Sequence, residues 1–211
     1  MLRRFKSDII LHIQKNITLY LVVLFAILTG IASGIFTASS MTNDQKLALG
    51  NYLEGFFQQN THEPINRTMV FWQSLKQNLQ SSFLIWLAGL ILFGIPFIFF
   101  FVGIRSFFIG FAFGFLLDRY RVGGFLFALL CILPQTFIFL IGFLLTGVVA
   151  MEHSLDRFKK RKLTLPKEQL KKETLSYTLK TLALFVFLTI GSLLEAYITP
   201  AFFDLFGWVF N

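Results

Sequence analysis

The sequence predicts an all-α integral membrane protein, a polytopic bundle of five spans formed by a single domain over residues 1–211. Long uncharged runs recur along the chain, and a helix needs about 20 apolar residues to cross a hydrocarbon core of roughly 30 Å. Hydrophobic residues make up 55% of the chain, and 29 residues are Phe. The net charge of +8 therefore belongs to loops. A soluble nucleic-acid-binding protein is excluded, because it would need an exposed basic face.

Five runs are expected to form the spans. In chain order they cover residues 17–39, 83–104, 107–117, 122–151 and 179–198. The third has only 11 residues. Because proline removes a helical hydrogen bond, Pro96 and Pro134 are expected to kink or interrupt the second and fourth spans. The fourth span is then either one kinked helix or two half-helices, and Gln135 lies at membrane depth, where its amide needs a partner.

Basic residues predict the topology. Lys and Arg stay on the cytoplasmic side of a membrane, and they collect in the N-terminal tail and in the loop at residues 152–180. Both segments lie inside only if an even number of spans separates them, so the short run 107–117 must cross. This arrangement places 14 of the 19 basic residues inside, with the N-terminus in and the C-terminus out. Arg105 is expected near an end of the short span, where its long side chain reaches the interface.

Two glycine pairs have the spacing of close helix contacts. Gly30 and Gly34 lie in the first span, and Gly110 and Gly114 lie in the third. Glycines four residues apart let two helix backbones approach each other. Glycine is also frequent in membrane helices in general, so the pattern is compatible both with a contact face and with ordinary composition.

The extracytoplasmic loop at residues 40–82 is long enough to hold amphipathic helices. Residues 42–45 have the spacing of a capping box, in which a hydroxyl and an amide satisfy each other's backbone donors. Apolar residues up to Phe57 then recur on one helical face. A second amphipathic stretch covers residues 69–79.

These helices have two interpretations. They either lie on the membrane and cap the bundle, or they form a docking surface for an extracytoplasmic partner. In the second case four aromatic residues are the candidate contacts: Tyr52, Phe56, Phe57 and Trp72.

The sequence contains no recognisable catalytic or metal-binding constellation. His62-Glu63 lacks the second His of a zinc-peptidase motif and is followed by a proline. There is no phosphate-binding glycine loop and no paired Cys. We therefore expect no enzymatic activity, no cofactor and no metal. Glu195 is the one ionisable residue well inside a span, which suggests function, but its place near the outer end is also typical of a structural acid.

Three motifs in order make the chain similar to the stage II sporulation protein M family. The motifs are Gly110-Phe111-x-x-Gly114-Phe115-Leu116, Leu133-Pro134-Gln135 and Glu195-Ala196-Tyr197-x-x-Pro200. The basic N-terminal tail, the Tyr52–Phe57 helix, the Gly94-Ile95-Pro96 step and the order of the spans also resemble the family. Thr136 departs from it, because some members carry Asn there.

The resemblance implies a multi-pass cell-membrane protein of an endospore former, located in the mother-cell membrane that engulfs the forespore. It further implies a non-enzymatic scaffold of a peptidoglycan-degrading complex, with membrane lipids and two extracytoplasmic wall hydrolases, stage II sporulation proteins D and P, as partners. A homo-oligomer is compatible with the sequence, and nucleic acid is not an expected partner. The alternative function is a transporter or channel-like protein, because transporters use interrupted helices with polar groups such as Gln135 and Glu195 at membrane depth.

Overall fold

The computed structural model describes residues 11–61, 66–161 and 166–206, and the regular elements within these ranges are all helices. In chain order they are α2 (Ile17–Ser39), α3 (Asn43–Thr61), α4 (Arg67–Leu90), α5 (Ile95–Phe127), the π-helical turn η1 (Ala128–Ile132), α6 (Leu133–Lys160) and α7 (Lys167–Phe206). The predicted all-α class is confirmed.

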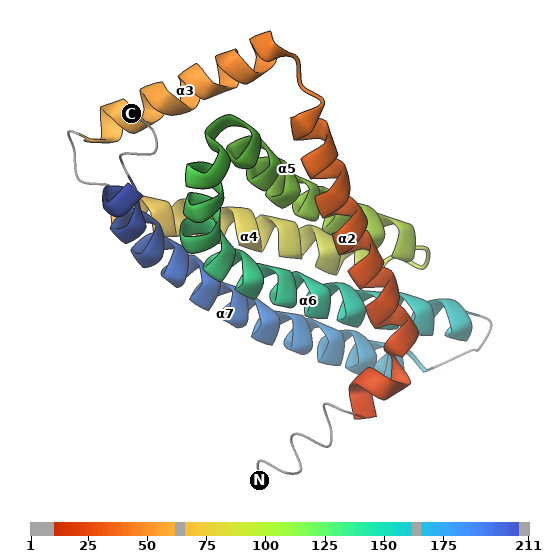
Figure 1. The fold of residues 1–211 in the computed structure, drawn as a ribbon. Coiled ribbons are helices and arrows are strands. Elements are labelled where there is room, and N and C mark those ends of the chain that lie inside the picture. Colours follow the sequence, from red (N-terminus) through yellow and green to blue (C-terminus); the bar gives the residue numbers. More distant parts are fainter. Residues whose placement is uncertain (1–10, 62–65, 162–165, 207–211) are drawn as a thin grey trace.

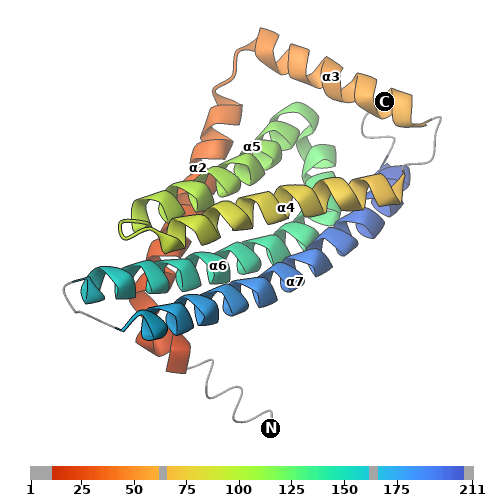
Figure 2. The same ribbon diagram turned by 180° about the vertical axis from the view of Figure 1, so that it is seen from behind.

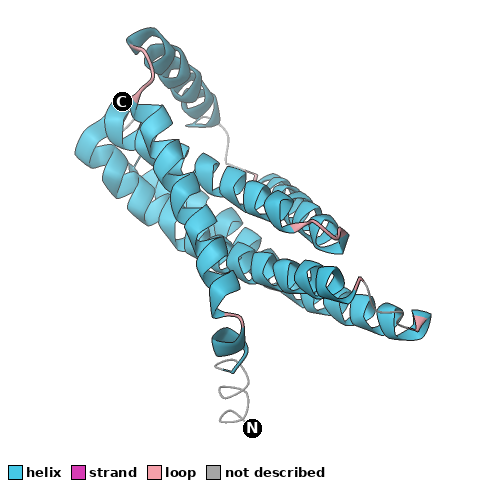
Figure 3. Cartoon of the chain, turned by 90° about the vertical axis from the view of Figure 1, so that its right-hand side faces the viewer, coloured by secondary structure: helices cyan, strands magenta, loops and turns pink. Residues whose placement is uncertain are grey.

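Five of these helices pack into one bundle, and α3 lies apart at one end of it (Figures 1 and 3). α4, α6 and α7 run side by side, as the view from behind also shows (Figure 2), while α2 crosses the bundle along α5. Each of the five helices contributes a fully buried apolar side chain to the core: Val23, Ile85, Ile98, Phe143 and Leu188.

Within the described ranges, four helices are long and apolar enough to cross a membrane, namely α2, α5, α6 and α7. The chain is therefore a multi-pass membrane protein. The predicted first span, residues 17–39, coincides with α2. α4 is also long, but polar residues recur along it as far as Ser82, so it is not among these four helices. The count of five spans and the orientation of the bundle stay predictions.

The second span predicted over residues 83–104 is wrong, because the chain reverses within it. α4 ends and α5 begins inside this run, and α6 holds the turn between them. The Ser154 hydroxyl accepts from the Gly94 N–H at 3.1 Å and donates to the Ile91 carbonyl at 2.8 Å. Pro96 lies in the first turn of α5, where a missing N–H breaks no helical bond. It therefore starts a helix instead of kinking one.

The short third span predicted over residues 107–117 does not exist as a separate element. These residues lie in the middle of α5, whose helical path continues to Arg121. Residues 95–104, which were predicted to lie in the second span, supply most of the missing length. Arg121 has a φ of 49°, which is rare for a residue other than glycine. The chain reverses its direction in this region before it enters α6 (Figure 1).

A π-helical turn interrupts the long run 122–151 directly ahead of Pro134. The chain passes from the end of α5 through η1 into α6, and Pro134 lies in the first turn of α6. A proline clashes with the carbonyl four residues before it, and the wider π turn relieves that crowding by shifting the hydrogen bonds. The run is therefore one interrupted helix, and the sharper break lies earlier, at Arg121.

The start of α2 and the end of α6 lie at the same end of the bundle. His12 Nε2 lies 3.4 Å from the carboxylate of Glu152, and the Asn16 amide donates to that carboxylate at 3.1 Å. Arg157 donates to the carbonyl of Leu90 in the α4–α5 turn at 2.8 Å. We call this the basic end, because the last turn of α6 carries three basic residues.

Candidate functional site

The two glycine pairs predicted from the sequence face each other across the α2–α5 contact. A Cβ on Gly30 or Gly34 would overlap backbone atoms of α5, and a Cβ on Gly110 or Gly114 would overlap backbone atoms of α2. A larger residue at any of these positions would push the two helices apart. The structure therefore places all four glycines on one helix–helix seam.

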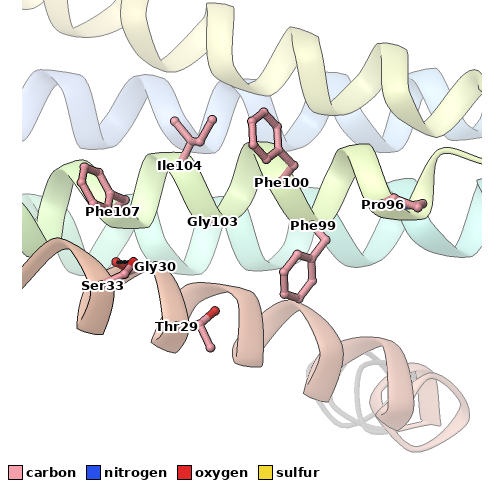
Figure 4. Close-up of a pocket in the computed structure, with 9 residues that line it drawn as sticks. All are labelled: Thr29, Gly30, Ser33, Pro96, Phe99, Phe100, Gly103, Ile104 and Phe107. Carbon is pink, nitrogen blue, oxygen red and sulfur yellow. Dashed lines mark hydrogen bonds between the residues drawn. The ribbon is translucent and has the colours of Figure 1, made fainter. Parts of the chain in front are cut away.

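A shallow groove of about 540 Å³ opens on this seam (Figure 4). Apolar side chains of α5 line most of it. Its two hydroxyl groups are satisfied within α2, because Thr29 and Ser33 donate to carbonyl oxygens of their own helix at 2.8 and 2.9 Å. The groove thus presents an apolar surface to a lipid chain or a neighbouring helix and offers no reactive group.

A polar network crosses the bundle and links α4, α5 and α7. At its centre, the side-chain carbonyl of Asn78 accepts from Arg105 Nη2 at 2.7 Å. The amide nitrogen of Asn78 donates to Ser74 Oγ at 3.2 Å and to Ser192 Oγ at 3.3 Å. Ser74 in turn donates to a carboxylate oxygen of Glu195. We call these five residues the polar network, in which neutral side chains connect a cation to a carboxylate.

Burial strengthens this network. Asn78 is only 1% exposed and Ser192 is fully buried, so water does not compete for their hydrogen bonds. The guanidinium of Arg105 also lies over the ring of Phe143, 5.5 Å from its centroid. The chain of contacts therefore compensates both charges, although Arg105 Nε and Ser82 Oγ are buried with no hydrogen-bond partner among the described residues.

The expected position of Arg105 at a membrane end is wrong. Helical rise puts Arg105 about 15 Å from the start of α5, and its partner Asn78 lies in the core. The sequence analysis missed Asn78 altogether. A signal for it was present, because Ser74, Asn78 and Ser82 are spaced four residues apart and so share one face of a helix. All three are buried.

The remaining polar residues predicted at membrane depth lie in or near the core. Glu195 belongs to the polar network. Gln135 is 6% exposed and is not without a partner. Pro134 precedes it in the first turn of α6, so the interruption of the helix and the buried amide are neighbours in space as well as in sequence.

Polar contacts hold α3 over the end of the bundle opposite the basic end (Figure 1), which we call the α3 end. The predicted capping box is confirmed. The Thr42 N–H donates to Gln45 Oε1 at 3.1 Å, and the Gln45 N–H donates to Thr42 Oγ1 at 3.4 Å. Lys46 donates to the Ser39 carbonyl at 3.2 Å and pairs with Asp118 of α5 at 2.7 Å.

The predicted docking residues of α3 are placed only in part. Tyr52 is 71% exposed. It borders a groove of about 730 Å³ between α3, α2 and α5, together with Phe36 and Phe111. The side chains of Phe56 and Phe57 lie outside the described residues. The structure therefore presents at least one of the predicted aromatic contacts at the α3 end.

The second amphipathic stretch predicted for the external loop is not a separate helix on the membrane surface. Residues 69–79 form the first half of α4, and their buried side meets α7 through the polar network. Trp72 is 62% exposed on this helix. Tyr52 and Trp72 therefore stand on different helices, and only α3 lies apart from the bundle.

Among the described residues, no group of three or more His, Cys, Asp or Glu side chains could hold a metal ion. The identity of the chain comes from comparison with known families. A model described as stage II sporulation protein M matches residues 21–200. The chain belongs to the stage II sporulation protein M family. The match extends from α2 into α7, so the glycine seam and the polar network lie within the part that identifies this family.

Membership in the stage II sporulation protein M family makes the chain a sporulation-related membrane protein. This family is not known as a family of enzymes. Searches of curated proteins and of solved structures gave no match to the chain.

Proposed function

We propose that this protein is a non-enzymatic scaffold that recruits extracytoplasmic wall hydrolases to a membrane during engulfment. In this proposal it is the multi-pass anchor of a peptidoglycan-degrading complex in the mother-cell membrane. The expected partners, by family resemblance, are stage II sporulation proteins D and P. Bond cleavage in the wall belongs to those partners, and the present chain fixes their position.

The observation that carries this proposal is the placement of α3. A 19-residue helix stands clear of the bundle, yet the Lys46–Asp118 ion pair and the capping box hold its first turns in place. Its exposed Tyr52 borders the groove between α3, α2 and α5. Tyr presents a large apolar ring with a hydrogen-bonding tip, which suits a protein interface.

The proposed topology puts the α3 end outside the cell and the basic end inside. α4 is then a span in addition to the four apolar helices. Its 24 residues give a helix of about 36 Å at 1.5 Å per residue. α2 runs outward, α4 inward, α5 outward, α6 inward and α7 outward. Under this topology α3 faces the space that holds the wall.

The scaffold proposal is tested on the α3 aromatic residues. Changing Tyr52, Phe56 and Phe57 together to Ser is expected to reduce co-purification of the two hydrolases at least tenfold and to delay engulfment, while membrane insertion is unchanged. Tyr52→Phe is the matched control. It keeps the aromatic ring, so hydrolase co-purification and engulfment are expected to be unchanged. Unchanged co-purification in the triple variant would refute docking on α3.

A second candidate function is a proton- or cation-coupled transporter, favoured by the polar network. An ionisable residue in a membrane bundle can mark an ion pathway, and Glu195 is connected to Arg105 through Asn78 and Ser74. Substitution of Glu195 distinguishes the two functions. Glu195→Gln keeps the shape and most hydrogen bonds, so a scaffold is expected to keep full engulfment, whereas Glu195→Leu should lower the amount of folded protein. Normal protein levels with complete loss of engulfment in Glu195→Gln would favour transport.

A further inference from the structure

A polar cleft of about 420 Å³ lies at the basic end between the C-terminal part of α6 and the N-terminal part of α7. Two contacts between the helices define it. Lys160 pairs with Glu173 at 2.8 Å, and the ring of His153 stacks on Tyr177 with centroids 4.3 Å apart. The cleft takes no part in the glycine seam, the polar network or α3.

Charges of opposite sign line the two walls of this cleft. On α6, Glu152 and Asp156 are four residues apart and share a helix face with the cleft. On α7, Lys172, Ser176 and Lys180 follow the same four-residue spacing. Lys160 also lies on the α6 wall and Glu173 on the α7 wall, and these two side chains pair with each other. The remaining charges are acidic on the α6 wall and basic on the α7 wall.

Three of these charged groups form no ion pair with a described residue. The carboxylate of Glu152 already has partners, because His12 and Asn16 contact it. Asp156, Lys172 and Lys180 are exposed, and none has an ion pair with any residue that the structure describes. A carboxylate on one wall and two ammonium groups on the other are thus free to bind a ligand.

The floor of the cleft adds an unsatisfied nitrogen. Nε2 of His153 is buried and has no hydrogen-bond partner within the described ranges. Buried polar atoms in proteins nearly always have a partner. This nitrogen can accept from an ammonium group or donate to a phosphate oxygen, depending on the tautomer.

We propose that this cleft binds a phosphodiester that carries a primary ammonium group, as in the headgroup of phosphatidylethanolamine. The phosphate would lie against Lys172 and Lys180, and the ammonium would donate hydrogen bonds to Asp156. Both parts of the ligand are charged, so each contact is a charge-assisted hydrogen bond, which is stronger than a neutral one.

The position of the cleft favours a lipid as the source of this headgroup. Leu175, Leu179 and Leu182 of α7 are 60%, 57% and 56% exposed, and they form an apolar stripe on a face adjacent to that of Lys172 and Lys180. A headgroup in the cleft would leave its acyl chains free to follow this stripe. A free glycerophosphoethanolamine molecule has the same phosphodiester and ammonium charges but would gain nothing from the leucines.

The test measures binding of short-chain phosphatidylethanolamine, phosphatidylglycerol and phosphatidylcholine to the full-length protein in a neutral detergent. The wild type is expected to bind phosphatidylethanolamine at least fivefold more tightly than the other two. Phosphatidylglycerol has no ammonium, and the quaternary nitrogen of phosphatidylcholine cannot donate a hydrogen bond. Equal binding of all three lipids would overturn the proposal.

Two variants test the walls separately. Asp156→Asn is expected to bring the affinity for phosphatidylethanolamine down to that for phosphatidylglycerol, and Lys172→Gln with Lys180→Gln should weaken binding of every phospholipid. Glu168→Gln and Lys171→Gln are matched controls, because these exposed α7 residues lie outside the cleft. An Asp156→Asn variant that keeps the lipid preference would refute the assignment.

Binding of free glycerophosphoethanolamine identifies the source of the headgroup. Binding at least tenfold weaker than that of the short-chain lipid is expected and supports a lipid site. Equally tight binding of the free compound, lost in the same two variants, would support the headgroup chemistry and overturn the lipid as its source.

Discussion

Replacing Asn78 by Leu is the most direct perturbation of the bundle. Asn78 accepts one hydrogen bond from Arg105 and donates two, to Ser74 and Ser192. Leu has a similar volume but no polar atom, so the substitution deletes all three bonds without opening a large cavity. It also leaves the guanidinium of Arg105 facing an apolar side chain in the core.

The expected loss of stability follows from these contacts. Side-chain hydrogen bonds between membrane helices average about 0.6 kcal/mol each, and leaving a buried polar group unsatisfied costs about 1–3 kcal/mol. Asn78→Leu is therefore expected to lower the free energy of unfolding by about 3–5 kcal/mol. Ser81→Ala is the matched control on the same helix. Its hydroxyl donates only to the Gln77 carbonyl at 2.9 Å, and the expected change is within about 0.5 kcal/mol.

Reversible unfolding in mixed detergent micelles measures these differences. The decisive comparison adds Arg105→Met alone and in combination with Asn78→Leu. Because the two side chains share a hydrogen bond, the double variant should lose less stability than the sum of the single variants, by about 1–2 kcal/mol. Additive losses, or a loss below about 0.5 kcal/mol in Asn78→Leu, would refute the polar network as drawn.

Two further predictions concern topology and packing. A cysteine at Gln59 in α3 should react with an impermeant thiol reagent in intact cells, whereas one at Arg161 should react only after permeabilisation; labelling of Arg161→Cys in intact cells would contradict the proposed orientation. Gly110→Ala should lower the free energy of unfolding by about 1–3 kcal/mol, because its Cβ would strike the backbone of α2. Gly55→Ala is its control, because a Cβ there meets nothing within 4 Å, and the change should raise helix stability by up to about 1 kcal/mol. Equal effects of the two substitutions in the unfolding assay would argue against the glycine seam.

Hydropathy predicted the class of the protein but misplaced two helix boundaries. The α4–α5 turn at residues 91–94 is apolar, so an average over residues 83–104 shows no interruption there. The turn becomes visible only through its tertiary partners, Ser154 and Arg157. By contrast, α2 was predicted with the correct bounds, because polar residues flank it on both sides.

The parts of the candidate site that depend on residues close in sequence were predictable, and the parts that depend on distant residues were not. The capping box of α3 depends on Thr42 and Gln45 alone, and the sequence was sufficient to find it. The polar network depends on residues up to 121 positions apart, Ser74 and Glu195. The periodicity of residues within one helix cannot reveal such a contact with a distant helix. Only the spacing of Ser74, Asn78 and Ser82 hinted that one face of α4 would be buried despite its polarity.

That buried polar face explains how α4 shares a core with the four described helices that are apolar enough to span a membrane. The N-terminal half of α4 carries too many polar residues to be retained by apolar burial alone. It is held to α5 and α7 by Arg105, Ser192 and Glu195, and an amide or hydroxyl in a membrane interior favours such interhelical partners. The polar network thus gives α4 a fixed register against its neighbours.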